Sequence, residues 1–253
     1  MLEITSSENR RFRYFESLLT TKGIDKNQRA LLFGSKVVEE ILLGRKESVE
    51  ALIVPVGYES RAHNLDCFSL KKPLFERLDV FGTRSPIAVV RVPKIEADLT
   101  RAKLKGCTLV VPFQEPSNVG SVLRSAAAFD VENIFLTQEA AHPFHPRSSR
   151  AAAGAVFEHN YFQVSKLADF TFEALPVITL DFPGNVREQP SVENLDTFLF
   201  PSDFILVAGL EGPGVPKTLS PRYRITIPVT KKVESLNGPT ATAIALFSWF
   251  TRR

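Results

Sequence analysis

The loop at residues 234–237 combines side chains that could bind a small polar ligand. Glu234, Ser235 and Asn237 offer an anion, a hydroxyl and an amide beside the backbone N–H groups at the start of a predicted helix. Main-chain and side-chain hydrogen bonds together could hold such a ligand. The same pattern is also typical of a capped helix that follows a turn, so this loop alone leaves both interpretations open.

Two earlier loops carry related chemistry. Asn118 and Gly120 lie in a predicted turn, and Arg124 follows one helical turn later. An amide and a guanidinium could therefore converge beyond the end of a strand, where open α/β sheets bind ligands. The glycine-rich run 209–214, whose one carboxylate is Glu211, permits a close approach of the backbone to a ligand. Its composition suggests a nucleotide-like ligand.

Short apolar runs precede these loops and would position them. The runs alternate with helical patterns, which is typical of an α/β domain built on a parallel sheet. We expect buried strands at residues 108–112, 133–137, 174–181, 203–209 and 224–228. Helices are expected at residues 121–129 and 238–247, the second of them buried and capped by Ser235 or Asn237.

Residues 1–93 predict a smaller α/β domain of alternating elements. We expect strands at residues 30–33, 51–56 and 87–92 and a helix at 35–43. Residues 94–106 are charged and poor in large apolar side chains, so we expect them to form a linker. The second domain would then span residues 107–253.

A helical pattern over residues 5–22 places basic side chains on one face, interleaved with aromatic residues. One interpretation is a helix that contacts RNA phosphates, with aromatic rings nearby for base stacking, since Arg and Lys supply most sequence-independent affinity for RNA. The other is an ordinary solvated helix face. The candidate RNA contacts are Arg10, Arg11, Arg13, Arg147 and Arg150.

Composition excludes several classes of protein. The chain is 44% hydrophobic and 23% charged with a net charge of +3, which permits a nucleic-acid partner without requiring one. No apolar run reaches the roughly 18–20 residues that a membrane span needs, and the N-terminus does not resemble a signal peptide, so we expect a cytoplasmic protein. Cys67 and Cys107 are expected to be reduced, and the four histidines lack metal-ligand spacing, so we expect no metal.

Taken in order, the three loops resemble the three motifs of the SpoU (TrmH-type) branch of the SPOUT RNA methyltransferases. The matching segments are Asn118-x-Gly120-x-x-x-Arg124, Gly209-Leu-Glu211-Gly212-Pro-Gly214, and Ile227-Pro228 followed by Glu234-Ser235-Leu236-Asn237. Residues 4–9, 33–34 and 83–90 are similar to the L30e-like substrate-binding domain of that family. The resemblance covers nearly the whole chain.

This resemblance implies a parallel sheet with a deep trefoil knot, an S-adenosyl-L-methionine site and a homodimer interface beside that site. It also implies 2'-O-methylation of RNA, with ribosomal RNA favoured over transfer RNA because an L30e-like domain offers a second surface for a structured loop. The implied cofactor-binding residues are Val207, Ala208, Gly209, Glu211, Gly212, Ile227, Pro228, Ser235, Leu236 and Asn237. The residues implied to surround the reaction are Asn118, Arg124, Glu211, Ser235 and Asn237.

Several positions depart from the usual pattern of the family. Leu210 stands where the family usually has a polar residue, and Lys231 lies where it usually has a glycine. Ala152 replaces a serine, and residues 238–241 replace a Val-Ser/Ala-Val-Ala run. If these changes abolish activity, the chain would instead be a non-catalytic RNA-binding or ribosome-assembly factor on the same fold. For an active enzyme, we expect Arg124 to clamp a phosphate and stabilise the developing alkoxide, since a guanidinium with a pKa above about 12 rarely acts as a base.

Overall fold

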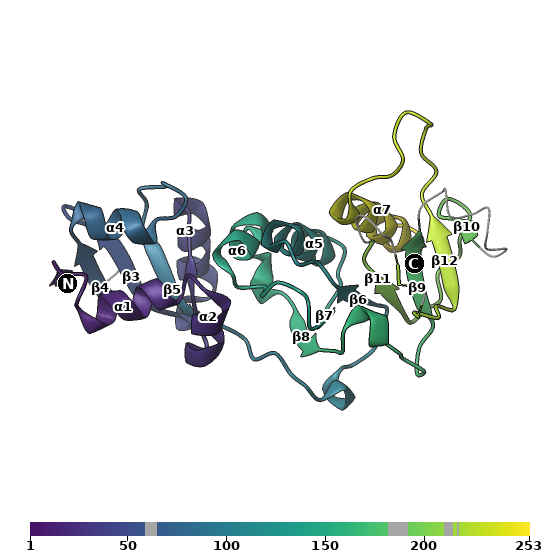
Figure 1. The fold of residues 1–253 in the computed structure, drawn as a ribbon, viewed down its shortest axis with the longest axis horizontal. Helices are drawn as coiled ribbons and strands as arrows, with labels where there is room; N and C mark the ends of the chain where they lie inside the picture. Colours follow the sequence, from purple (N-terminus) through teal and green to yellow (C-terminus); the bar gives the residue numbers. More distant parts are fainter. Residues whose placement is uncertain (59–64, 182–191, 210–214, 217) are drawn as a thin grey trace. The chain divides into compact units, whose positions relative to one another are not determined.

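The computed structural model describes residues 1–58, 65–181, 192–209, 215–216 and 218–253 (Figure 1). Within this part, contacts divide the chain into two compact units. The first unit contains Met1–Lys94 and His142–Gly154, and the second contains Ile95–Ala141 and Ala155–Arg253. Of the predicted linker, residues 94–106, all but Lys94 are grouped with the second unit. The functional division into domains at residues 93 and 107 stays a prediction.

The first unit is built on a mixed five-stranded sheet in the order β1-β4-β3-β5-β2. Its strands are β1 (Leu2–Ile4), β2 (Arg29–Leu32), β3 (Val49–Pro55), β4 (Asp66–Leu70) and β5 (Ile87–Arg91). Strands β1, β4 and β3 run parallel, whereas β5 runs antiparallel to its neighbours β3 and β2. The predictions of β2, β3 and β5 are confirmed, and β1 and β4 were not predicted.

The helices of the first unit are α1 (Arg10–Ser17), α2 (Thr21–Asn27), α3 (Ser35–Gly44), α4 (Lys72–Leu78) and α6 (Pro146–Ala152). The prediction of one helix over residues 5–22 is wrong, because Thr20 is extended and separates α1 from α2. Its hydroxyl caps α2 by accepting a hydrogen bond from the Gly23 N–H at 3.2 Å. The core of this unit contains Phe12, Phe15, Phe68 and Phe75.

The second unit is built on a seven-stranded sheet in the order β10-β12-β9-β11-β6-β7-β8, and every pairing in it is parallel. Its strands are β6 (Cys107–Val111), β7 (Asn133–Leu136), β8 (Asn160–Gln163), β9 (Val177–Asp181), β10 (Val192–Asn194), β11 (Phe204–Val207) and β12 (Tyr223–Thr226). The predicted α/β class with a parallel sheet is confirmed. Cys107 and Cys67 are free thiols, and burial raises the pKa of the Cys107 thiol.

Two long helices of the second unit, α5 (Pro116–Ala128) and α7 (Gly238–Phe250), pack against each other (Figure 1). Helix α5 begins earlier than predicted, because Pro116 suits the first helical turn and Glu115 accepts a hydrogen bond from the Ser117 N–H. The placement of Asn118 and Gly120 in a turn is therefore wrong, since both lie inside α5. Among the described residues, no helix is long and apolar enough to cross a membrane.

Candidate functional site

The loops that carry the three motifs leave the large sheet at one edge. They follow β6, β11 and β12, and because the strands are parallel, their carboxyl ends lie at the same edge. Strands β6 and β11 are neighbours, and β12 is separated from β11 only by β9. The topology of the sheet therefore gathers loops that are far apart in the sequence.

These segments touch at the start of α7. A Cβ atom placed on Gly238 would lie 2.2 Å from the carbonyl oxygen of Gly209 and 2.7 Å from the ring of Phe113. The Gly209 N–H also donates a hydrogen bond to Thr242 Oγ1 at 3.3 Å. Residues that follow β6, β11 and β12 thus meet around one position, which only glycine fits without displacement of its neighbours. The knot implied by the family resemblance stays a prediction.

The loop before α7 presents unpaired main-chain groups. Asn237 caps the helix as predicted, because its Oδ1 accepts a hydrogen bond from the Thr240 N–H at 2.9 Å. Ser235, Leu236 and Ile227 are half-buried, and their backbone groups have no hydrogen-bond partner among the residues that the structure describes. Partly buried N–H and C=O groups need partners, so these are available to a ligand.

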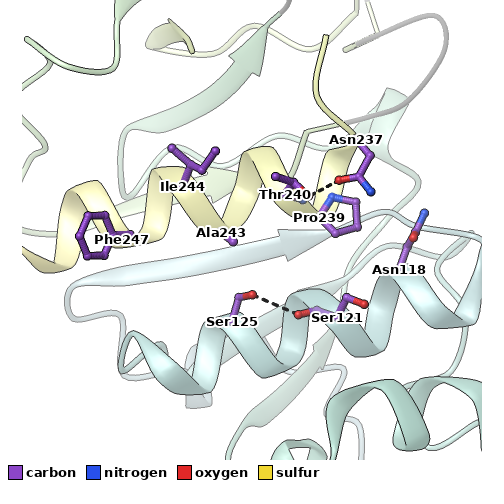
Figure 2. A pocket seen from close by; sticks show the side chains of 9 residues that line it. All are labelled: Asn118, Ser121, Ser125, Asn237, Pro239, Thr240, Ala243, Ile244 and Phe247. Atoms are coloured by element: carbon purple, nitrogen blue, oxygen red, sulfur yellow. Dashed lines mark hydrogen bonds between the residues drawn. The ribbon is translucent and has the colours of Figure 1, made fainter. Parts of the chain in front are cut away.

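A groove with a volume of about 410 Å³ lies between α5 and α7. Its lining residues are Asn118, Ser121, Ser125, Asn237, Pro239, Thr240, Ala243, Ile244 and Phe247. Figure 2 shows Asn118 and Asn237 at one end of the groove, where α7 begins, and Phe247 at the other end. The groove therefore brings together two of the predicted catalytic residues, one from the first motif and one from the third.

Arg124 is exposed on α5 and is not among the residues that line this groove. Consecutive side chains leave a helix about 100° apart, so Arg124 points in a different direction from its neighbour Ser125, which lines the groove. Its guanidinium makes no ion pair with any residue in the described part of the chain. The predicted convergence of Arg124 with Asn118 is thus not evident in the single chain, and the charge of Arg124 is free to meet an external anion.

The remaining predicted cofactor residues differ in exposure. Val207, Ala208 and Gly209 are buried, and the Ala208 N–H donates to the carbonyl oxygen of Val110 at 3.0 Å. Pro228 is exposed. The predicted site residues Glu211 and Gly212, and the departure at Leu210, lie outside the described residues.

Polar groups at the same edge of the sheet were not predicted from the sequence. Thr226 ends β12, and its buried hydroxyl has no hydrogen-bond partner among the residues that the structure describes. Beside it, Arg224 forms an ion pair with Asp181 at 2.9 Å, and the Asp181 side chain is only 4% exposed. The position of Thr226 at the end of the strand before the third motif was the available signal. In the described part of the chain, no three His, Cys, Asp or Glu side chains are grouped as a metal site requires.

The predicted basic helix is α1, which presents Arg10, Arg11 and Arg13 to solvent. The interpretation in which aromatic rings beside them stack on bases is wrong for Phe12 and Phe15, whereas Tyr14 is half-buried. Phe12 and Phe15 are buried in the core, because the aromatic positions of this short amphipathic helix face the sheet.

The other predicted RNA contacts, Arg147 and Arg150, are exposed on α6 in the first unit. The Arg150 guanidinium lies 4.6 Å from the centre of the Phe81 ring. Ala152 on the same helix is fully buried, so an alanine is well accommodated where the family often has a serine.

Comparisons with known proteins identify the family. The sequence pattern described as the SpoU rRNA Methylase family matches residues 106–247. A ribosomal RNA small subunit methyltransferase G 2 of Syntrophobacter fumaroxidans is 40% identical over 98% of this chain, but the match covers 49% of that protein, so the chain spans about half its length. A 23S rRNA (guanosine(2553)-2'-O)-methyltransferase of Bacillus subtilis is 26% identical over 98% of this chain and 98% of that protein.

Solved structures share the fold. The SpoU methyltransferase AviRb of Streptomyces viridochromogenes, in complex with the cofactor AdoMet, is similar with a TM-score of 0.79 at 20% identity, over 97% of this chain and 98% of that chain. A putative RNA methyltransferase of the TrmH family from Porphyromonas gingivalis gives a TM-score of 0.74 at 25% identity, over 97% of this chain and 99% of that chain. The strands that precede its three motifs all end at one edge of the sheet, and this chain belongs to the SpoU rRNA methylase family.

Proposed function

We propose that this chain transfers a methyl group from S-adenosyl-L-methionine to a ribose 2'-hydroxyl of ribosomal RNA. The observation that carries the proposal is the close approach of Phe113 and Gly209, which follow β6 and β11, to Gly238 at the carboxyl edge of the sheet. Relatives that support it include the Bacillus subtilis enzyme, whose name specifies 2'-O-methylation of 23S rRNA. With ribosomal RNA as substrate, the proposed location is the cytoplasm.

The residues present fit the proposed cofactor. Main-chain groups of Ile227, Ser235 and Leu236 are unpaired within the described residues, and the Thr226 hydroxyl is buried without a partner. An adenosine with an amino-acid tail offers donors and acceptors that can satisfy such groups. Gly209, together with Glu211 and Gly212 of the second motif, would complete the site. When bound, the cofactor supplies an electrophilic methyl group on a sulfonium.

The chain's own residues would align and activate the ribose. Methyl transfer is an in-line displacement, so positioning of the 2'-oxygen contributes much of the rate enhancement. Asn118 and Asn237, at one end of the groove, would orient the nucleotide by hydrogen bonds from their amides. Ser235 would assist them. The exposed Arg124 would clamp the neighbouring phosphate and stabilise negative charge on the oxygen, while water or a phosphate oxygen takes the proton.

Transfer of labelled methyl from S-adenosylmethionine to separate pools of unmodified ribosomal and transfer RNA tests this function. We expect label in the ribosomal pool, with resistance of the labelled site to alkaline hydrolysis reporting 2'-O-methylation. Label confined to the transfer RNA pool would support the proposed reaction but show that the substrate is transfer RNA. RNA binding without label or cofactor affinity would instead support a non-catalytic ribosome-assembly factor.

We also propose that the chain forms a homodimer through the groove between α5 and α7. Phe247 is 55% exposed and Ile244 is 37% exposed at the groove, and apolar side chains gathered on a surface favour a protein partner. A second copy packed there would lie beside Asn118 and Asn237.

Replacing Phe247 with aspartate is expected to convert the dimer to a monomer, because the interface would bury an unpaired carboxylate. Light scattering coupled to size-exclusion chromatography measures the mass directly. Leu43→Asp is the matched control, because Leu43 is 89% exposed on α3 of the first unit. A dimer that survives Phe247→Asp would show that its interface lies elsewhere.

The first unit is proposed as an L30e-like RNA-binding domain. Its helix α1 exposes Arg10, Arg11 and Arg13, which would contact phosphates of the substrate without reading its sequence.

A further inference from the structure

The turn at residues 79–86 joins α4 to β5 in the first unit and is fixed by a buried carboxylate. Asp79 is 6% exposed. Its two carboxylate oxygens accept hydrogen bonds from the Thr83 hydroxyl at 3.0 Å and from the Arg84 N–H at 2.6 Å. A buried carboxylate is costly unless it is hydrogen-bonded, so these bonds strongly favour one conformation of the turn.

That conformation holds Arg84 in a strained backbone geometry. Its φ is +52°, in the left-handed region that glycine, asparagine and aspartate tolerate better than arginine. The fold gives no reason for an arginine here, since the side chain is exposed and its guanidinium has no partner among the residues that the structure describes. Gln28 and Ala153 have a similar φ, but each ends a helix, whereas Arg84 lies in a turn, and backbone strain of this kind clusters at functional sites.

A second guanidinium lies at the same turn. Arg150 of α6 stacks over Phe81, 4.6 Å from the ring centre, and Phe81 itself packs edge-on against the buried Phe33. Arg84 follows Phe81 by three residues. A guanidinium stacked on a ring fixed in this way keeps its N–H groups available at its edge, the geometry that suits bidentate contact with an oxyanion.

We propose that Arg84 and Arg150 form a composite phosphate-contacting surface for the RNA substrate, with Asp79 as the positioning residue for Arg84. The inference rests on the proposed function, which supplies the RNA. The one acidic side chain of the turn, Asp79, is buried and hydrogen-bonded, so the exposed charge of the turn is positive. Each of the two guanidinium groups could contact a phosphate of a nucleic-acid backbone.

The test measures the affinity of the full chain for an RNA fragment that it methylates, by fluorescence anisotropy at several KCl concentrations. Arg84→Ala is expected to weaken binding severalfold and to lower the salt slope by about 1, because one phosphate contact is lost. Arg84→Gly should weaken RNA binding equally while raising the melting temperature by about 1–3 °C, since glycine relieves the strain. Arg222→Ala, an exposed arginine just before β12 in the second unit, is the control and should change neither quantity.

Asp79→Asn tests the positioning role. We expect a higher KM for RNA with kcat and cofactor affinity unchanged, because the guanidinium is retained but less well placed. If both Arg84 variants had unchanged RNA affinity and an unchanged salt slope, the inference would be overturned. Methyl transfer by the unaltered chain would still support the proposed function. Absence of RNA binding and methyl transfer in the unaltered chain would instead overturn the proposed function.

Discussion

Replacing Arg124 with alanine is expected to lower methyl transfer by about 10²–10³-fold, the loss seen when one group that stabilises a developing oxyanion is removed. Cofactor affinity and stability should stay unchanged. Arg124 is exposed on α5, and its guanidinium makes no ion pair with a described residue, so the fold does not depend on it. Its charge is available for the phosphate and the reacting ribose of a bound RNA.

Single-turnover kinetics measure the rate of methyl transfer, and calorimetric titration with S-adenosylmethionine measures the cofactor affinity. Arg124→Lys keeps the charge but loses the planar fork, so it should recover only a small part of the rate. Arg222→Ala removes an exposed arginine just before the amino end of β12, away from the motif loops, and should leave the rate of methyl transfer unaltered. If Arg124→Ala turned over at the normal rate, Arg124 would have no part in the reaction.

Most of the parallel sheet of the second unit was predictable because its central strands are buried on both faces, whereas the edge strands β8 and β10, which expose residues, were not predicted. β6 and β11 are buried at every position, so each appears in the sequence as a continuous apolar run. In the first unit, β4 begins with the exposed Asp66 and was missed. The edge strand β1 is only three residues long, too short for a periodic pattern to be recognised.

The candidate site was predictable in part. Asn237 was recognised as a helix cap because a polar side chain before an apolar run is a local signal. The groove that joins Asn118 to Phe247 depends on how α5 packs on α7, and no local pattern encodes that contact. The burial of Phe12 likewise depends on which face of α1 meets the sheet. The alternation of Arg and Phe residues in the sequence therefore could not show whether the rings stack on RNA bases or pack in the protein core.

The largest structural effect is expected from Gly238→Ala, at a position where this chain departs from the usual family pattern. The added Cβ would lie 2.2 Å from the Gly209 carbonyl oxygen and 2.7 Å from the Phe113 ring, so the start of α7 must move away from the end of β11. Overpacking of this kind costs about 1–3 kcal/mol, which corresponds to a fall of roughly 3–10 °C in melting temperature. Because Ser235 and Leu236 precede this turn, cofactor affinity should fall with it.

Thermal unfolding measures the change in melting temperature, and calorimetric titration with S-adenosylmethionine measures the change in cofactor affinity. Gly44→Ala is the matched control, because a Cβ there meets no atom within 4 Å, and this variant should be as stable as the original chain or slightly more so. Thr242→Val is a milder change at the same junction. It keeps the volume but removes the oxygen that accepts from the Gly209 N–H, at a cost of about 1–3 kcal/mol. Retention of full cofactor affinity in both variants would show that the junction of the three loops does not shape the cofactor site.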